Sequence, residues 1–334
     1  MKKAILVSVL VILSMLPISP SEAIERGSKC KIFGAFNSNF ICLKSGKSLI
    51  WQKFQTVLGV QAAISLSLKS SNLPKDLRPE LSKVRSDKSL WLDQECSVDF
   101  SDVTVPNCLA GDPNGKKTMV VYGDSHASMW MTALDSIAQK SGYRIYLFAK
   151  LACPLVEVPI WSYQLNRTFD ECLEWQKLVL PRIESLKPDV LIVTDQWKPV
   201  VIEGKKSDAE TPSVWSREFP RALQKLNSYT KKLIVLSNNP SMQQDSVSCA
   251  SKPRAIISQC VSSRNQAGNL QINRIEQEAA KSLSATFINT VDFACNDYLC
   301  PIVIAKQFVY FDQWHFTATY VNWLRPVLEK SMNL

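Results

Sequence analysis

The sequence has few glycines and histidines: its 334 residues include 10 glycines and two histidines, His126 and His315. About 3% glycine, against a usual ~7%, makes any glycine in a sharp turn conspicuous. Zinc sites need several histidine or cysteine ligands, and the chain has no paired C-x-x-C motif, so we expect neither metal nor cofactor. With 46% hydrophobic and 21% charged residues, the composition also excludes disordered, collagen-like and coiled-coil chains.

After the first residues, no apolar run is long enough to cross a bilayer. The first 23 residues resemble a secretory signal. Lys2 and Lys3 precede an apolar run from Ala4 to Leu16, and small residues stand before the expected cleavage point after Ala23. An uncleaved anchor is the alternative. Either way we expect a secreted or cell-envelope, extracytoplasmic protein.

The chain is basic, with a formal charge of +9. Removing residues 1–23 takes away two positive charges and one negative charge, which leaves +8. Outside the cytoplasm such a charge favours acidic envelope polymers or phospholipid headgroups as partners, rather than nucleic acid. A merely soluble, cationic surface is the alternative.

All ten cysteines follow the predicted signal, and an even number in an oxidising compartment indicates disulfides. They fall into sequential neighbours along the chain. The spacing therefore favours five local bridges: Cys30–Cys42, Cys96–Cys108, Cys153–Cys172, Cys249–Cys260 and Cys295–Cys300.

Two regions follow the signal. Residues 24–115 predict an irregular N-terminal extension with one helical stretch from about Ser48 to Leu68. Residues 116–334 alternate apolar runs with helical patterns, which predicts a parallel sheet covered on both faces. The predicted strands are Thr118–Tyr122, Arg144–Phe148, Val190–Thr194, Leu233–Ser237 and Thr286–Asn289, with helices at Ala127–Ser141, Phe169–Leu186, Val214–Tyr229, Asn265–Leu283 and Thr317–Met332. We therefore expect an α/β fold, a three-layer αβα sandwich with a five-stranded parallel sheet.

The first predicted strand ends in Gly123-Asp124-Ser125-His126 and passes directly into a helix. Ligands of open α/β sheets bind beyond the carboxyl ends of the strands, so Ser125 is a candidate nucleophile with backbone donors nearby. Alternatively, Asp124 or Ser125 only caps the helix. His126 is too close in sequence to serve Ser125 as a base, and we expect it to shape or bind.

A base for Ser125 has to come from His315, the other histidine. It lies in Asp312-Gln313-Trp314-His315, just before the last predicted helix. This spacing lets one turn hold both side chains, with Asp312 orienting the imidazole. A helix-capping Asp312 beside a partly buried His315 is the alternative.

Together the two motifs resemble the SGNH hydrolase superfamily, the GDSL-type esterases. Gly-Asp-Ser-His-Ala, a downstream Cys153-Pro154 and the pair Cys295 and Cys300 ahead of Asp-x-x-His are most similar to the SGNH domain fused to membrane acyltransferase-3 proteins, which O-acylate envelope polysaccharides. The resemblance covers about residues 90–334. It implies Ser125 as nucleophile, His315 as general base and acid, Asp312 as its partner, and an acyl-enzyme.

The usual oxyanion donors of that superfamily, a glycine and an asparagine, are not visible. The third strand runs instead into Asp195-Gln196-Trp197. A substitute donor is expected in the loop after Phe148 or at the Gln196 side chain. Aromatic rings suit sugar faces, so Trp130, Trp197 and Trp314 are candidate substrate contacts, as are Asp124 and His126. Packing of the tryptophans against the N-terminal extension is the alternative.

We therefore expect an exported esterase or O-acyltransferase acting on O-acetyl groups of an extracellular or cell-envelope carbohydrate. Its expected partners are an acylated saccharide substrate and a separate membrane acyltransferase, and we expect a monomer. A catalytically inactive carbohydrate-binding protein of the same fold is the first alternative, favoured by the missing glycine and asparagine. A lipolytic GDSL esterase is the second.

Overall fold

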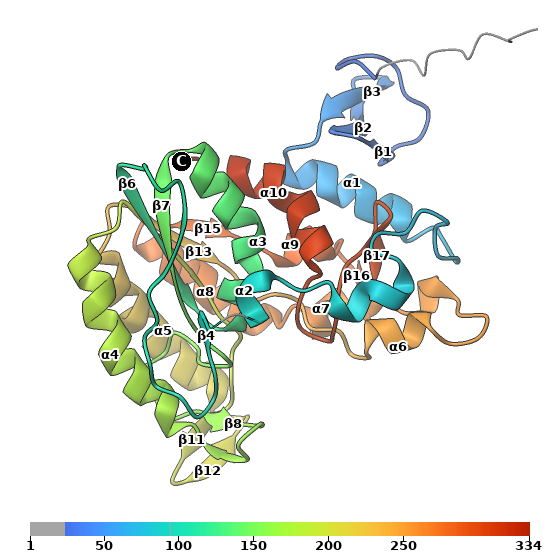
Figure 1. Ribbon diagram of the computed structural model, residues 1–334. Helices are drawn as coiled ribbons and strands as arrows, with labels where there is room; N and C mark the ends of the chain where they lie inside the picture. Colours follow the sequence, from blue (N-terminus) through green and yellow to red (C-terminus); the bar gives the residue numbers. More distant parts are fainter. Residues whose placement is uncertain (1–23, 94) are drawn as a thin grey trace, which may run out of the picture.

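The computed structural model describes residues 24–93 and 95–334, so the predicted signal at residues 1–23 lies outside the described residues. One parallel sheet forms its centre, in the order β15-β13-β10-β6-β7 (Figure 1). These five strands are β6 (Lys117–Gly123), β7 (Tyr143–Lys150), β10 (Val190–Thr194), β13 (Leu233–Leu236) and β15 (Thr286–Ile288). They confirm the five strands that the apolar runs predict.

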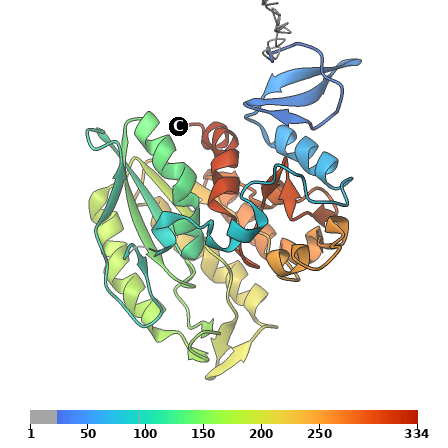
Figure 2. The same ribbon diagram turned by 45° about the vertical axis from the view of Figure 1, so that its right-hand side comes forward.

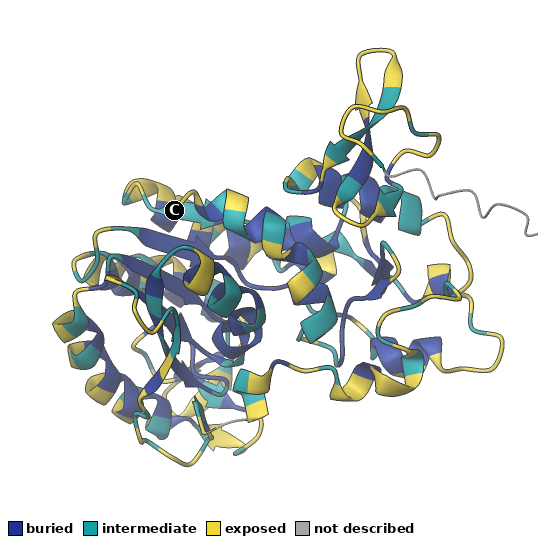
Figure 3. Cartoon of the chain, turned by 45° about the horizontal axis from the view of Figure 1, so that its top comes forward, coloured by how far each residue is buried: buried dark blue, intermediate teal, exposed yellow. Residues whose placement is uncertain are grey.

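Both faces of the sheet are buried, which explains why its strands are apolar at nearly every position. In β6, Met119 and Val121 pack into one hydrophobic cluster, whereas Val120 and Tyr122 pack into a second cluster on the opposite face. In Figure 3 the strands of this sheet are mostly dark blue, the colour of buried residues. The sheet therefore separates two cores.

Helices cover each face of the sheet (Figures 1 and 2). The first cluster includes the buried residues of α3 (Ser125–Lys140) and α10 (Ala318–Met332). The second cluster includes those of α4 (Asp170–Leu186), α5 (Thr211–Asn227) and α8 (Leu270–Ser282). This arrangement confirms the three-layer αβα sandwich. No helix among the described residues is long and apolar enough to cross a membrane.

The sheet has seven strands rather than the five expected. The two additional strands are β4 (Ser97–Val98), parallel to one end of β7, and β5 (Cys108–Gly111), antiparallel to the other. Both precede residue 116. They are too short to show a periodic pattern in the sequence, and the disulfide Cys96–Cys108 joins the segments that carry them.

The expectation of a helix from about Ser48 is wrong in its first part. The chain first forms an antiparallel sheet of β1 (Phe36–Asn37), β2 (Phe40–Ser45) and β3 (Ser48–Lys53), and only then α1 (Val57–Ser67). Pairing with β2 makes Ser48–Lys53 a strand, and the Thr56 hydroxyl caps the helix that follows. We call residues 24–56 the N-terminal module. Its Phe54 stacks on Trp323 of α10 with ring centroids 4.4 Å apart.

The predicted helix Asn265–Leu283 is divided into α7 (Arg264–Ala267) and α8. The break falls at Gly268 and at Asn269, whose backbone is left-handed with φ 38°. The remaining elements are short: α2 (Leu90–Asp93), α6 (Ser246–Ala250), α9 (Val291–Ala294), 3₁₀ helices Leu81–Ser86 and Ile257–Gln259, and the strand pairs β8–β9 (Trp161–Ser162, Arg167–Thr168), β11–β12 (Val200–Ile202, Lys205–Ser207), β14–β16 (Ser262–Ser263, Leu299–Cys300) and β17–β18 (Val303–Ile304, Gln307–Phe308).

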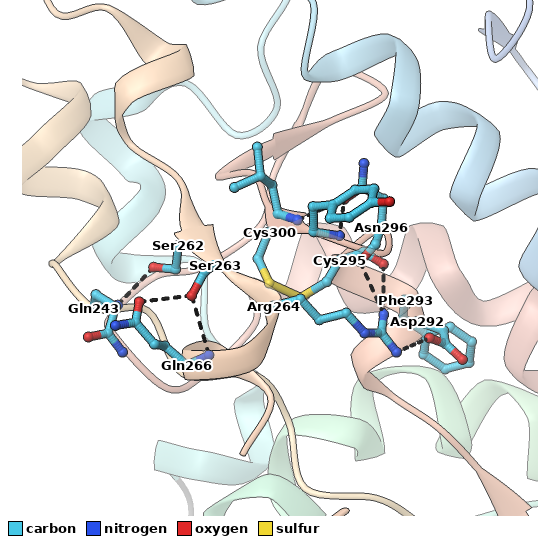
Figure 4. The surroundings of a disulfide bond; sticks show 12 residues. Gln243, Ser262, Ser263, Arg264, Gln266, Asp292, Phe293, Cys295, Asn296 and Cys300 are labelled. Atoms are coloured by element: carbon cyan, nitrogen blue, oxygen red, sulfur yellow. Dashed lines mark hydrogen bonds and ion pairs between the residues drawn. A yellow bond between two sulfur atoms is a disulfide. The ribbon is translucent and has the colours of Figure 1, made fainter. Parts of the chain in front are cut away.

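Five disulfides join sequential neighbours: Cys30–Cys42, Cys96–Cys108, Cys153–Cys172, Cys249–Cys260 and Cys295–Cys300. Figure 4 shows the last of them beside Arg264, whose guanidinium donates to the Cys295 carbonyl (3.3 Å) and to the Asp292 carboxylate (2.6 Å). These contacts brace the chain ahead of the Asp312–His315 turn. Five disulfides are typical of extracytoplasmic proteins.

Candidate active site

Ser125 lies at the carboxyl edge of the sheet, at the first position of α3. A side chain at Gly123 would place its Cβ 1.7 Å from the Thr194 carbonyl oxygen of β10, so only glycine permits the two strands to approach this closely. Asp124 caps α3 by accepting the His126 backbone N–H at 2.9 Å. The capping alternative therefore holds for Asp124 and leaves the Ser125 hydroxyl free for another partner.

That partner is His315, 190 residues away in the sequence. The distance from Ser125 Oγ to His315 Nε2 is 2.8 Å, and the distance from His315 Nδ1 to Asp312 Oδ2 is also 2.8 Å. The second oxygen of Asp312 accepts the backbone N–H groups of Trp314 and His315, both at 2.7 Å. The structure thus brings the three residues together in the order hydroxyl, imidazole, carboxylate.

Two aromatic rings fix the plane of the His315 imidazole. Phe311 stacks on one face at 5.3 Å and 7°, and His126 stacks at 4.9 Å and 24°. Burial raises the pKa of Asp312. The hydrogen bond from His315 and the charge of the protonated His315 ring lower it by more, so the pKa of Asp312 lies below its usual value. An ionised Asp312 accepts the Nδ1 proton of His315, which leaves Nε2 to receive the serine proton.

His126 is buried and uses both ring nitrogens. Its Nδ1 lies 3.0 Å from Asp124 Oδ1, and its Nε2 lies 3.2 Å from the Trp314 carbonyl oxygen. Both partners are acceptors, which fits a doubly protonated ring. Burial disfavours that charge, but the Asp124 carboxylate outweighs burial and raises the pKa of His126. His126 is thus a buried support for His315, and its two engaged ring nitrogens leave none to serve Ser125 as a base.

This buried pair predicts a pH-dependent stability. The pKa of His126 is higher in the folded than in the unfolded protein, where it is about 6.5. The contribution of His126 to the free energy of unfolding is therefore complete below the unfolded pKa and is lost as pH rises through the folded pKa. We expect His126→Asn to be less stable than the wild type, with a gap that narrows as pH rises from about 6 to about 9. Urea unfolding across this range measures the gap, and a gap independent of pH would contradict the assignment.

The hydroxyl of Ser125 and the ring of His315 open onto a cavity of about 690 Å³. Five aromatic side chains line it: Phe100, Tyr163, Trp197, Phe311 and Trp314. Trp314 remains 44% exposed, as a ring that meets a ligand would. Trp130 is instead fully buried, edge-on to Phe293 and Phe316, so it belongs to the core and not to the cavity. The predicted N-terminal extension contributes to both places: Lys88, Leu92, Asp93 and Phe100 line the cavity, and Trp130 shares its hydrophobic cluster with Val60 and Val84.

The family model of the SGNH domain, the domain found fused to AT3 domains, matches residues 95–330. The chain belongs to this SGNH family. It is therefore an ester-acting enzyme, an acyl-ester hydrolase or an acetyltransferase.

Three solved structures resemble the SGNH domain. The periplasmic domain of a lipopolysaccharide acetyltransferase from Salmonella ser. Paratyphi A is 15% identical, with 63% of this chain and 81% of that chain covered and a TM-score of 0.47. An α/β hydrolase from the metagenome of Lake Arreo, Spain, is 8% identical (66% and 96% covered, TM-score 0.42). An acetylxylan esterase from Geobacillus stearothermophilus is 11% identical (66% and 96% covered, TM-score 0.38). Comparison with curated protein sequences gives no match.

Two backbone N–H groups, on residues that line the cavity, are candidate oxyanion donors of the SGNH domain. They belong to Ser125 and to Ala152, a residue with φ 58° in the loop after β7. Within residues 24–93 and 95–334, neither N–H has a hydrogen-bond acceptor. Ala152 lies in the loop after Phe148, where the sequence predicts a substitute donor. The sequence does not identify the residue itself, because alanine rarely adopts a left-handed backbone.

Two contacts hold the loop just after Ala152. Its neighbour Cys153 is bonded to Cys172 of α4, and the Leu155 N–H donates to the buried Asp195 carboxylate at 2.7 Å. Burial, together with the charge of Asp124, raises the pKa of Asp195 to about 7. These anchors fix the loop independently of any ligand.

The Gln196 side chain lines the cavity but is already engaged. Its amide donates to Ser241 Oγ at 3.1 Å and accepts from Lys198 Nζ at 2.8 Å. Its backbone N–H donates to Asp124 Oδ2 at 3.1 Å, which ties the end of β10 to the turn that carries Ser125. We therefore assign Gln196 to the cavity wall and favour Ala152 as the second donor.

Lys150 is a structural residue that the sequence does not reveal. Its side chain is fully buried at the end of β7, and its ammonium donates to the carbonyls of Asp99 (2.6 Å), Phe100 (3.1 Å) and Asp102. Burial lowers the pKa of Lys150 to about 8. Lys150 thereby fixes the loop from which Phe100 reaches the cavity.

Proposed function

We propose that this SGNH protein is an exported serine esterase or O-acyltransferase that acts on O-acetyl groups of a cell-envelope carbohydrate. Ser125 is the nucleophile, His315 is the general base and then the acid, and Asp312 orients the imidazole. The proposal is carried by one observation: Ser125 Oγ and His315 Nε2 are 2.8 Å apart, with Asp312 bonded to the far side of the ring.

The reaction proceeds through an acyl-enzyme. Ser125 Oγ attacks the ester carbonyl carbon while its proton moves to His315 Nε2. The N–H groups of Ser125 and Ala152 stabilise the oxyanion, and the N-terminus of the 16-residue α3 adds a favourable field. The tetrahedral intermediate collapses, and the leaving sugar oxygen takes the proton from His315. A second hydroxyl then gives its proton to His315 and attacks the acyl-enzyme. The bond between the acyl carbon and Ser125 Oγ breaks, and Oγ takes the proton back from His315.

Whether the second hydroxyl belongs to water or to a sugar separates hydrolysis from transfer. The aromatic side chains that line the cavity suit the apolar faces of sugar rings, which supports a carbohydrate ligand. The fusion of this domain to AT3 domains in other proteins supports a separate membrane acyltransferase as acyl donor.

Trapping the acyl-enzyme tests the proposal. Mixing the protein with 4-nitrophenyl acetate is expected to release a burst of one 4-nitrophenol per enzyme, because deacylation of such an activated ester is slower than acylation. Acid quenching and peptide mass analysis should find the acetyl group on the peptide that contains Ser125. Acetylation spread over surface lysines, with the Ser125 peptide unmodified, would contradict the proposal.

A further inference from the structure

The N-terminal module carries a charge that the proposed reaction does not use. Residues 24–56 precede the part of the chain that the SGNH family model matches. They contain one acidic residue, Glu25, and six basic residues: Arg26, Lys29, Lys31, Lys44, Lys47 and Lys53. All six basic side chains are exposed, and none of them makes an ion pair with another described residue.

One end of the module combines this charge with exposed apolar side chains. Lys44 lies near the end of β2, and Lys47 lies in the turn between the paired Ser45 and Ser48. Lys31 reaches the same end, because Cys30 donates its N–H to the carbonyl of Leu49. Next to Lys31, Ile32 is 57% exposed and Phe33 is 41% exposed. We call Lys31, Ile32, Phe33, Lys44 and Lys47 the basic tip.

The module projects from the αβα sandwich beside α1 (Figures 1 and 2). The residues of the hairpin end, 44–48, are all exposed (Figure 3). The fold also fixes the base of the module. Gly34 lies so close to α1 that a Cβ there would be 2.1 Å from the Ala62 carbonyl oxygen, and the disulfide Cys30–Cys42 closes the loop that carries Ile32 and Phe33. The apolar pair is thus held in solvent.

We propose that the basic tip binds the surface of an anionic phospholipid bilayer. Lysines near such a surface are attracted by its negative potential, and the two apolar side chains can enter the boundary between headgroups and acyl chains. An anionic polysaccharide would explain the lysines but not the exposed Ile32 and Phe33. Binding would hold the enzyme at the membrane whether or not residues 1–23 are removed.

Co-sedimentation of the chain from residue 24 onward with lipid vesicles tests this inference. We expect binding to vesicles of phosphatidylglycerol and phosphatidylcholine in equal parts, and none to phosphatidylcholine alone. Raising the salt concentration should weaken binding. The double variant Lys44→Glu and Lys47→Glu should bind at least ~20-fold more weakly, and Ile32→Ser with Phe33→Ser should also lose affinity.

The matched control is Lys177→Glu with Lys281→Glu, which changes the net charge equally on exposed positions of α4 and α8. It should bind like the wild type. If the control lost as much vesicle affinity as Lys44→Glu with Lys47→Glu, the effect would be one of net charge, and the proposal would be overturned. Binding to soluble alginate but not to vesicles would also overturn it. Retained 4-nitrophenyl acetate hydrolysis shows that the variants fold. Ser125→Ala should bind vesicles normally, so this inference and the proposed function fail independently.

Discussion

Replacing Ser125 by alanine is expected to lower the rate of 4-nitrophenyl acetate hydrolysis by about 10³-fold or more, the scale of a lost triad nucleophile. The variant keeps the backbone N–H groups of residues 125 and 152 but has no hydroxyl oxygen to form the acyl-enzyme. The initial rate of 4-nitrophenol release measures the loss. His315→Ala should lose a similar factor, and the double variant should lose little more, because the two residues act as a unit.

Ser136→Ala provides the matched control for the nucleophile. Ser136 lies on the same helix, α3, and is only partly exposed, but it does not line the cavity that holds Ser125. This variant should retain the wild-type rate and the wild-type unfolding transition. If Ser125→Ala retained a fast wild-type rate, Ser125 would not be the nucleophile. If the wild type and Ser125→Ala were equally slow, an SGNH fold that binds carbohydrate without acting on it would be the better account.

Gly123→Ala is expected to have the largest effect on stability. The new methyl group would overlap the Thr194 carbonyl oxygen, and β6 and β10 would have to separate at the edge where Ser125 and the Asp124 cap are held. We expect the free energy of unfolding to fall by at least ~3 kcal/mol, as for severe overpacking of a core. Urea unfolding followed by circular dichroism measures this difference, and esterase activity should fall with it.

Gly142→Ala distinguishes the cost of steric overlap from the cost of backbone strain in the free energy of unfolding. Gly142 has φ 71° and, in contrast to Gly123, nothing within 4 Å of a new Cβ. Only the cost of placing alanine in a left-handed conformation remains there, roughly 1–2 kcal/mol. If both variants lost the same amount, close approach of the strands would not be the reason for glycine at position 123.

The central strands and helices are predictable because each is long and patterned. β6, β7, β10 and β13 are apolar on both faces, and the long helices show one apolar face each, so local sequence suffices. β3 is mispredicted because its apolar residues also fit a helix, and only its pairing with β2 decides. β4 has two residues, and its place in the sheet is set by tertiary contacts.

The candidate site also has residues that the sequence predicts and residues that it does not. Ser125, Asp312 and His315 stand in short motifs whose chemistry is readable from residue type and spacing. Ala152 is not readable, because its φ of 58° depends on the loop that the Cys153–Cys172 bridge and Asp195 hold. The stacking of His126 on His315 joins residues from the two ends of the domain. Such contacts follow from the assembled fold alone.

The separation of Ser125 from His315 along the chain also has a consequence for synthesis. A polypeptide that emerges amino end first presents this hydroxyl long before the imidazole that activates it on the proposed mechanism, since the two positions are 190 residues apart. On the proposed mechanism, the nascent chain therefore has no esterase activity until its last segment has been synthesised and has docked.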